Sequence, residues 1–187
     1  MTVQIPTIET PRLILRKLRR EDTPRFYSRL ASSAEVTKYM LWIPHRDPSE
    51  SAASIEKVLK RYESGESCRW AIALKETDEL IGIIDLLRFD EDAKSCSFAY
   101  MLGKAFWGKG YGTEAVKAVF AFAFDVLGME VIAADHFTDN PASGAVMRKA
   151  GMVWQRTLPR QYEKNGRAFD AEEYRITKQQ WNMQKGG

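Results

Sequence analysis

Cysteine and histidine are scarce in this chain of 187 residues, which contains two of each. Neither the pair Cys68 and Cys96 nor the pair His45 and His136 has the spacing of a metal site, and two cysteines make no disulfide framework. A chain with so few cysteines suits a reducing compartment. We therefore expect no bound metal and a location in the cytoplasm.

Long apolar runs are also missing. No uninterrupted apolar segment approaches the ~20 residues that a membrane-spanning helix needs. The N-terminal sequence, MTVQIPTIETPR, lacks the basic start and the apolar stretch of a secretory signal. We therefore expect no membrane as a partner.

A large excess of charge of one sign is missing as well, because 28 basic and 25 acidic residues give a formal net charge of +3. The densest basic patch runs from Arg16 to Arg20 and is followed directly by Glu21 and Asp22. A solvated strand end explains this patch better than a nucleic-acid footprint does. We expect no nucleic acid as a partner, whereas the small basic excess suits an acidic small-molecule cofactor.

What the chain does contain is the composition of an ordinary globular domain. Hydrophobic residues make up 44% of it and aromatic residues 11%, which supports a core and excludes disorder for most of the chain. No internal repeat, low-complexity stretch or Pro/Gly/Ser-rich linker divides the sequence. The expectation is a single domain over residues 1–187.

Capping signals and periodicity predict the elements of the first half. In the sequence Asp47-Pro48-Ser49-Glu50, Asp47 can cap a helix, Pro48 suits its first position and Glu50 can complete a capping box. Gly65 is expected to end this helix. The other elements expected here are a strand over 12–17, a helix over 22–33, a hairpin of strands at 68–75 and 80–89, and a strand over 96–102.

Residues 113–127 of the second half are almost continuously apolar, with the sequence TEAVKAVFAFAFDVL. The alternation of Phe and Ala can mimic a strand, but the length of the run and the closing Gly128 favour a buried helix. The elements expected after it are a strand over 131–137, a helix from Asn140-Pro141 to about residue 150, and strands over 152–157 and 168–177. This is an α/β order with a mixed sheet rather than a strict βαβ repeat.

Three glycines, Gly108, Gly110 and Gly112, lie between an expected strand and the buried helix. Glycine permits positive φ and lets a ligand approach the backbone closely. Successive N–H groups of such a turn, the N-terminus of the following helix and the charge of Lys109 together favour a diphosphate. The spacing G-x-G-x-G fits neither the dinucleotide fingerprint nor the nucleotide P-loop. A turn that serves only the path of the chain is the alternative.

Two motifs in this order resemble a known family. The segments WGKGYGTEA at 107–115 and DNPASGAVMRKAGM at 139–152 resemble the GNAT superfamily of acetyl-coenzyme A-dependent N-acetyltransferases. The opening TPRLILRKLRREDTPRFY at 10–27 is most similar to the branch that contains the bacterial ribosomal-protein N-alpha-acetyltransferases. The likeness covers roughly residues 8–178.

The resemblance implies the fold. It implies an α/β (α+β) domain with a mixed, mostly antiparallel central sheet of about seven strands flanked by helices. It also implies that the strands at 96–102 and 131–137 splay apart, with the thioester of acetyl-coenzyme A (acetyl-CoA) in the opening.

The resemblance further implies which residues hold the cofactor. The amides of Gly108 to Thr113 would bind the pyrophosphate of coenzyme A, and the strand ending in Tyr100, Met101 and Leu102 would pair with the pantetheine arm as an added strand does. Trp107 departs from the broad superfamily pattern but is usual for this branch. The cofactor-binding residues implied by this motif are Trp107, Gly108, Lys109, Gly110, Tyr111, Gly112 and Thr113.

Asn140 and Ser143 each have two interpretations. Asn140 before a proline is a strong helix cap, and Ser143 can be an ordinary serine of the first turn. The resemblance implies that Asn140 also bonds the pantetheine and that Ser143 points toward the sulfur. Many relatives carry a proton-donating tyrosine where this chain has Met147, so Ser143 is the expected catalytic residue. A backbone N–H near Met101 or Leu102 is the expected oxyanion donor.

The general base and the acceptor stay open at this stage. Many relatives carry a glutamate where this chain has Ser97, so Asp85, His136 or water is left as the base. Both side chains also have structural interpretations, as a hydrogen-bonded strand residue and a hydrogen-bonded histidine. Trp42 and Ile43 are expected to line the acceptor side, although core packing explains Trp42 equally well.

The resemblance implies an enzyme that acetylates a primary amine by direct attack in a ternary complex with acetyl-CoA. The acceptor is either the N-terminal amine of a protein, as in the ribosomal branch, or a small molecule, since fold alone does not decide the acceptor. The alternatives are a non-catalytic module that binds coenzyme A as a sensor and an interaction protein without a cofactor. A homodimer is the default expectation, because dimers are common in this branch.

Overall fold

The computed structural model describes residues 3–185 of the chain. These residues form two compact units, of which the first comprises 3–86 and 99–118 and the second 87–98 and 119–185. Three elements contribute residues to both units, namely strands β4 (Leu80–Asp90) and β5 (Ser95–Leu102) and helix α4 (Tyr111–Ala121). The prediction of one domain over 1–187 stays a prediction.

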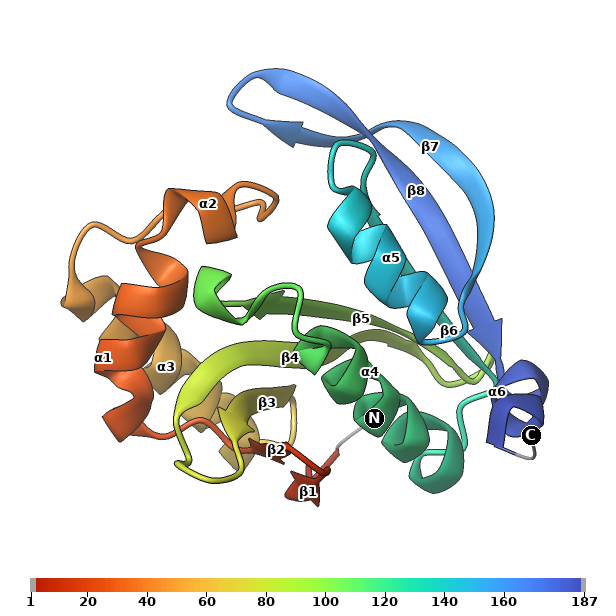
Figure 1. Cartoon of the computed structure of the whole chain (residues 1–187), viewed down its shortest axis with the longest axis horizontal. Coiled ribbons are helices and arrows are strands. Elements are labelled where there is room, and N and C mark those ends of the chain that lie inside the picture. The colour runs from red at the N-terminus through yellow and green to blue at the C-terminus, as the bar shows by residue number, and fades with distance from the viewer. Residues whose placement is uncertain (1–2, 186–187) are drawn as a thin grey trace. The chain divides into compact units, whose positions relative to one another are not determined.

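The strands form one mixed, mostly antiparallel sheet flanked by helices, as expected (Figure 1). It has eight strands in the order β1-β2-β3-β4-β5-β6-β8-β7, rather than about seven, because the two-residue β1 is too short to give a periodic signal. The strands besides β4 and β5 are β1 (Ile8–Glu9), β2 (Leu13–Arg16), β3 (Cys68–Leu74), β6 (Val131–Phe137), β7 (Val153–Lys164) and β8 (Arg167–Thr177).

The helices include several short segments that periodicity alone does not resolve. The expected helix over 22–33 is built from three consecutive turns of different helical type, and α2 and α6 are additional. The helical segments besides α4 are η1 (Arg20–Asp22), α1 (Thr23–Arg25), η2 (Phe26–Ala31), α2 (Ala34–Thr37), α3 (Pro48–Glu63), η3 (Lys104–Phe106), η4 (Phe122–Val126), α5 (Pro141–Lys149) and α6 (Lys178–Lys185). None of the helices within residues 3–185 is long and apolar enough to cross a membrane.

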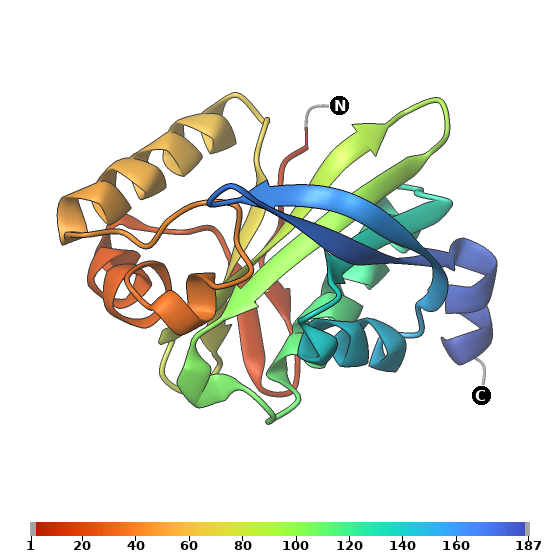
Figure 2. The same ribbon diagram turned by 90° about the horizontal axis from the view of Figure 1, so that it is seen from above.

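In the first unit, antiparallel pairing runs from β1 through β2 and β3 to the first part of β4. Leu13 and Trp70 are among its fully buried side chains, and α3 packs against α1 and η2 (Figure 2). Asp47 caps α3 as predicted by accepting the N–H of Ser49. Glu50, however, accepts the N–H of Arg46 at 3.0 Å, so the predicted capping box is formed with the residue before the cap.

The basic patch at the end of β2 was predicted to be solvated, and this is wrong for Arg16. Its side chain lies in the interior, where two nitrogens donate to Asp22 at 2.8 and 2.9 Å and Nε donates to Asp78 at 2.6 Å. Arg19 and Arg20 are more exposed and form ion pairs with Asp78 and Glu56. Carboxylates therefore compensate three of the four basic residues of this patch.

In the second unit, β6 pairs with β8 and β8 with β7, both in antiparallel fashion. Strands β7 and β8 form a long ribbon, drawn in blue beside α5 in Figure 1. The expected strand over 152–157 continues to Lys164 because a bulge between Leu158 and Tyr162 accommodates Pro159. Arg160 stands in this bulge at φ +52°, and its N–H donates to Asp170 at 2.8 Å.

Strands β5 and β6 run parallel over a short ladder. It joins Ser95, Cys96 and Ser97 to Val131, Ile132 and Ala133, respectively, all of them in the second unit. The buried helix predicted over 113–127 is confirmed as α4 followed by the π-helical turn η4. Phe120 and Phe124 are fully buried, and both rings pack on Trp181 of α6.

Candidate functional site

The glycine-rich segment of the first unit joins η3 to α4. Gly108 and Gly110 have φ values of +72° and +82°, so the prediction that this turn uses the conformational freedom of glycine is confirmed at two positions. Gly112 lies in the first turn of α4 instead. Residues 107–110 are exposed, which leaves the loop before α4 accessible to an anion, whereas residues 111–114 of the first helical turn are partly or fully buried.

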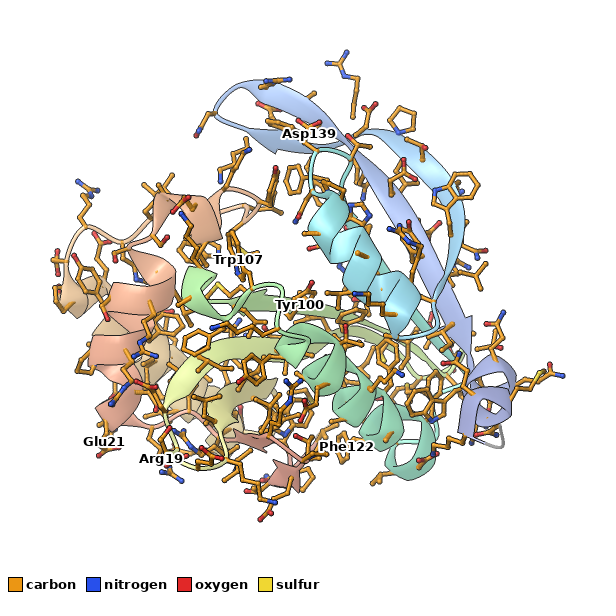
Figure 3. The ribbon with its side chains drawn as sticks, in the orientation of Figure 1. Arg19, Glu21, Tyr100, Trp107, Phe122 and Asp139 are labelled. Carbon is orange, nitrogen blue, oxygen red and sulfur yellow. The ribbon has the colours of Figure 1, made fainter. Side chains whose placement is uncertain are left out.

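The end of β5 is tied to this loop by Trp107, whose side chain extends from the segment between β5 and α4 (Figure 3). The indole Nε1 donates to the carbonyl oxygen of Leu102 at 2.7 Å, while 47% of the residue stays exposed. Gly82 of β4 packs against the same strand end, where a Cβ would clash with the carbonyl oxygen of Met101. Of the two predicted segments, Leu102 at the end of one and Trp107 at the start of the other are therefore in contact within the first unit.

Lys109 carries the one full positive charge that the sequence places among the three glycines. Its ammonium lies 5.9 Å from the centre of the Phe106 ring, and no ion pair with it is found within residues 3–185. The neighbouring Lys104, in contrast, is paired with Glu35 at 2.6 Å. Among the residues that the structure describes, no carboxylate thus compensates the charge of Lys109.

Asn140 and Ser143 meet in the second unit, at the start of α5. The side-chain oxygen of Asn140 accepts the N–H of Ser143 at 3.4 Å, and its amide nitrogen donates to the hydroxyl oxygen of Ser143 at 2.9 Å. The predicted cap is therefore present. Because the hydroxyl of Ser143 accepts this bond, its own proton remains to be donated to another group.

His136 is a residue of β6, and its side chain lies against α5. Its Nδ1 is 2.8 Å from the carbonyl oxygen of Phe137, so this nitrogen carries the proton in the neutral ring. The ring stacks on Tyr174 with centroids 5.6 Å apart, and the buried Nε2 has no hydrogen-bond partner within residues 3–185. A Cβ on Gly144 would lie 2.5 Å from this Nε2. The structural interpretation of His136 is therefore realised.

Asp85 of β4 forms an ion pair with Arg69 of the neighbouring strand β3, whose Nε donates to the carboxylate at 2.7 Å. Burial raises the pKa of Asp85, and the charge and hydrogen bond of Arg69 oppose that rise. Ser97 donates to the carbonyl oxygen of Leu87 at 3.3 Å. Asp85 is thus a hydrogen-bonded strand residue, and Met147 is a buried core residue of α5.

The segment with Trp42 and Ile43 follows α2 in the first unit. Ile43 is 60% exposed, whereas the ring of Trp42 packs on His45 with centroids 5.3 Å apart. The Nδ1 of His45 lies 2.8 Å from the hydroxyl of Ser51. No group of three or more His, Cys, Asp or Glu side chains is placed to hold a metal ion in the part of the chain that the structure describes.

Sequence reasoning did not identify Arg12 and Glu114, whose side chains lie beside the glycine loop. Arg12 forms an ion pair with Glu114 at 2.7 Å, and its Nη1 donates to the carbonyl oxygen of Lys109 at 3.0 Å. The two residues are 102 positions apart, so no local pattern connects them. Only the packing of the β1–β2 turn against α4 reveals the contact.

Comparison with known proteins identifies relatives over most of the chain. The family model of the acetyltransferase (GNAT) domain matches residues 12–153. The uncharacterized N-acetyltransferase YoaA of Bacillus subtilis is 30% identical over 174 residues, which are 92% of this chain and 97% of that protein. The uncharacterized N-acetyltransferase p20 of Bacillus licheniformis is 32% identical over 176 residues, which are 94% and 98% of the two chains.

Solved structures share the fold at lower sequence identity. A candidate ribosomal-protein-serine acetyltransferase from Vibrio cholerae superposes with a TM-score of 0.82 at 20% identity and covers 95% of this chain and 99% of its own. The spermidine N-acetyltransferase of Vibrio cholerae, solved in complex with CoA and spermine, gives a TM-score of 0.79 at 20% identity, with 92% and 99% covered.

Proposed function

Because the chain belongs to the acetyltransferase (GNAT) domain family, we propose that it transfers the acetyl group of acetyl-CoA to a primary amine by direct attack in a ternary complex. The amine nitrogen forms a bond to the thioester carbon, the bond from carbon to sulfur breaks, and the amine loses a proton while the thiolate gains one. The products are an acetylated amine and coenzyme A.

The observation that carries the proposal is the conformation of the glycine loop. Gly108 and Gly110 take positive φ immediately before α4, and an N-terminal helical turn binds phosphate oxygens through its free N–H groups. We assign the pyrophosphate of coenzyme A to the amides of residues 108–113, with Lys109 adding a full charge. The pantetheine arm is assigned to the strand end Tyr100–Leu102, beside which Trp107 packs.

Ser143 is the proposed proton donor to the departing thiolate. Its hydroxyl oxygen accepts from Asn140, which orients the O–H away from that amide and leaves its proton to be given. Asn140 would bond the pantetheine while it caps α5, because the hydrogen bond that its side-chain oxygen accepts from the N–H of Ser143 is long, at 3.4 Å. The buried Met147 has no proton to offer.

We propose water as the route by which the amine loses its proton. Asp85 accepts from Arg69, and His136 uses Nδ1 on Phe137 and turns Nε2 toward Gly144. Both side chains thus have structural partners. An amine that is partly neutral at working pH needs no dedicated base, provided that it is held near the thioester.

The acceptor is proposed as a primary amine, either at a protein N-terminus or on a small molecule. A fold shared with enzymes of different acceptors does not choose between them. One of the structural neighbours is named a spermidine N-acetyltransferase, so a protein of this fold has a polyamine in its name as the acceptor. A homodimer in the cytoplasm stays the expected state of the protein.

The experiment that tests the function is steady-state release of coenzyme A thiol from acetyl-CoA across a panel of amines. The panel contains N-terminal peptides, polyamines and aminoglycosides, and calorimetric titration of acetyl-CoA alone is the control. Release that depends on an amine is the expected result. Tight binding without release for every amine would favour the non-catalytic coenzyme A sensor, and absence of binding would overturn the assignment of the glycine loop.

The variant Ser143→Ala tests the proton donor. We expect kcat to fall by about 10²-fold, because a positioned general acid contributes that much, while the Kd of acetyl-CoA in calorimetry is nearly unchanged. Ser143→Thr keeps a hydroxyl and should recover part of kcat, and Ser64→Ala at the exposed end of α3 is the matched control. An unchanged kcat in Ser143→Ala would remove this residue from the chemistry.

A further inference from the structure

Glu114 places a carboxylate in the first turn of α4, the helix whose N-terminus is assigned to a diphosphate. Like charges repel, so this carboxylate by itself would oppose binding of the anion. Its side chain is only 15% exposed and therefore cannot turn freely into water. Something in the structure must compensate its charge.

Three donors from the β1–β2 turn form hydrogen bonds with this carboxylate. Oε1 accepts from the hydroxyl of Thr10 at 2.7 Å and from the backbone N–H of Arg12 at 2.9 Å. Oε2 accepts from Nε of Arg12 at 2.7 Å, and Nη2 of the same guanidinium forms an ion pair with Oε2 at 2.7 Å. The pair of guanidinium and carboxylate is neutral, and although burial favours the protonated acid, the three hydrogen bonds lower the pKa of Glu114.

The same guanidinium also contacts the glycine loop. Its Nη1 donates to the carbonyl oxygen of Lys109 at 3.0 Å, and its central carbon lies 4.5 Å from the centre of the Tyr111 ring. Nη2 lies 3.3 Å from the position that a Cβ of Gly110 would occupy. Arg12 therefore touches three successive residues of the loop, and every nitrogen of its guanidinium has a partner in the protein.

We propose that Thr10, Arg12 and Glu114 form a neutral brace that fixes the glycine loop in its anion-binding conformation and cancels the charge of Glu114 beside the diphosphate. Arg12 is in this view a positioning residue, since its nitrogens serve protein atoms. A loop with two glycines at positive φ loses much conformational freedom when it is ordered, and a brace that orders it beforehand makes binding tighter. The part that concerns the diphosphate rests on the proposed function.

The first test measures the affinity of the Arg12→Gln variant for acetyl-CoA by calorimetry. We expect Kd to rise by about tenfold, the size of effect that one uncompensated charge and a looser loop can produce. Arg20→Gln removes the same charge from an exposed ion pair with Glu56 and should leave Kd unchanged. Adding Glu114→Gln to Arg12→Gln removes the repelling charge and should restore part of the affinity.

The second test separates a positioning role from a general structural one. Acetyl-pantetheine carries the same thioester without the diphosphate, so kcat/KM for this substrate should be the same in Arg12→Gln and in the wild type. Arg12→Lys keeps the charge but cannot bond to Glu114 and Lys109 at the same time. Its Kd for acetyl-CoA should lie between that of the wild type and that of Arg12→Gln. An equal loss with acetyl-pantetheine would overturn the brace in favour of a structural contact.

A third measurement needs no cofactor. Backbone amides of residues 108–112 should exchange hydrogen faster in free Arg12→Gln than in the free wild type, whereas Arg20→Gln should not differ. If the wild type fails to bind acetyl-CoA, the proposed function is wrong and this exchange still decides whether the brace orders the loop. If the wild type binds and Arg12→Gln changes neither Kd nor exchange, the brace is wrong.

Discussion

Two arginines, Arg16 and Arg69, occupy strands whose neighbouring side chains are mostly apolar and buried. Each is matched by a carboxylate, Asp22 for Arg16 and Asp85 for Arg69. Removing one partner of such a pair leaves a charge in the interior without compensation, which costs more than the pair itself contributes. At the scale of the residue, these pairs determine which single changes the protein tolerates.

Arg69→Met leaves the carboxylate of Asp85 buried and unpaired. We expect the free energy of unfolding at pH 7 to fall by about 3 kcal/mol, as for other broken buried pairs. Burial already raises the pKa of Asp85, so the folded chain binds this proton more tightly than the unfolded chain does. The stabilising effect of that proton is therefore lost as pH rises, and the penalty of Arg69→Met should be smaller at pH 4 than at pH 7.

Urea unfolding at the two pH values measures this effect. Arg20→Met, which breaks an ion pair at the surface, is the control. At each pH its urea concentration at the unfolding midpoint should equal that of the wild type. A loss of stability in Arg69→Met that is equal at pH 4 and pH 7 would show that lost packing, rather than the charge of Asp85, is responsible.

Helix α5 shows at the scale of the element how small residues and polar contacts set the position of a helix. Its start is capped by Asn140, and near its end Nη1 of Arg148 donates to the hydroxyl of Tyr174 at 2.8 Å. Between them Gly144 lies directly over His136, where a side chain has no room. The helix therefore approaches β6 closely, and Ser143 is held one residue from this contact.

Gly144→Ala tests this close approach. Helix propensity alone predicts a gain of about 1 kcal/mol, but the added Cβ would lie 2.5 Å from Nε2 of His136, whose ring is fixed by Phe137 and Tyr174. We expect a net loss of about 1 kcal/mol or more in the free energy of unfolding, since overpacking exceeds the gain. In a His136→Asn background, which removes Nε2, the same substitution should be neutral or stabilising.

Denaturation in urea of the four proteins gives the coupling between the two positions. Equal effects of Gly144→Ala in both backgrounds would mean that His136 does not limit the approach of α5. A separate measurement of kcat in Gly144→Ala shows whether the position of Ser143 depends on this contact.

The whole molecule consists of two compact units that share three elements of secondary structure. Strands β4 and β5 and helix α4 each have residues in both units. Neither unit keeps β4 and β5 complete when the other unfolds, because each of these shared strands would lose part of its length and its ladder. At this scale the question is whether the chain behaves as one cooperative domain, as its length and composition predict.

We expect both units to unfold in one step. Hydrogen exchange in increasing urea should give the same opening free energy for the central amides of β3 in the first unit and of β6 in the second. A lower opening free energy for β6, with its own dependence on urea, would show two domains that unfold separately and would contradict the single domain predicted from the sequence.

Patterns that are local in the chain were sufficient for much of the fold and for the family. Strand 131–137 is present with the predicted bounds, and the caps at Asp47 and Asn140 are formed, because alternation and capping depend on residues close in sequence. The glycine loop was located for the same reason. Short elements such as β1 and the continuation of β7 past Pro159 depend on pairing with a distant strand and left no local signal.

The sequence by itself determined the class of fold, the order of its main elements and the motifs that mark an acetyltransferase, because these depend on local spacing of apolar, glycine and capping residues. Only the tertiary structure decided which side chains meet. It pairs Arg12 with Glu114 and Arg69 with Asp85, and it places Gly144 against His136. Such contacts join residues on separate elements, and their geometry is set by how the elements pack rather than by any spacing along the chain.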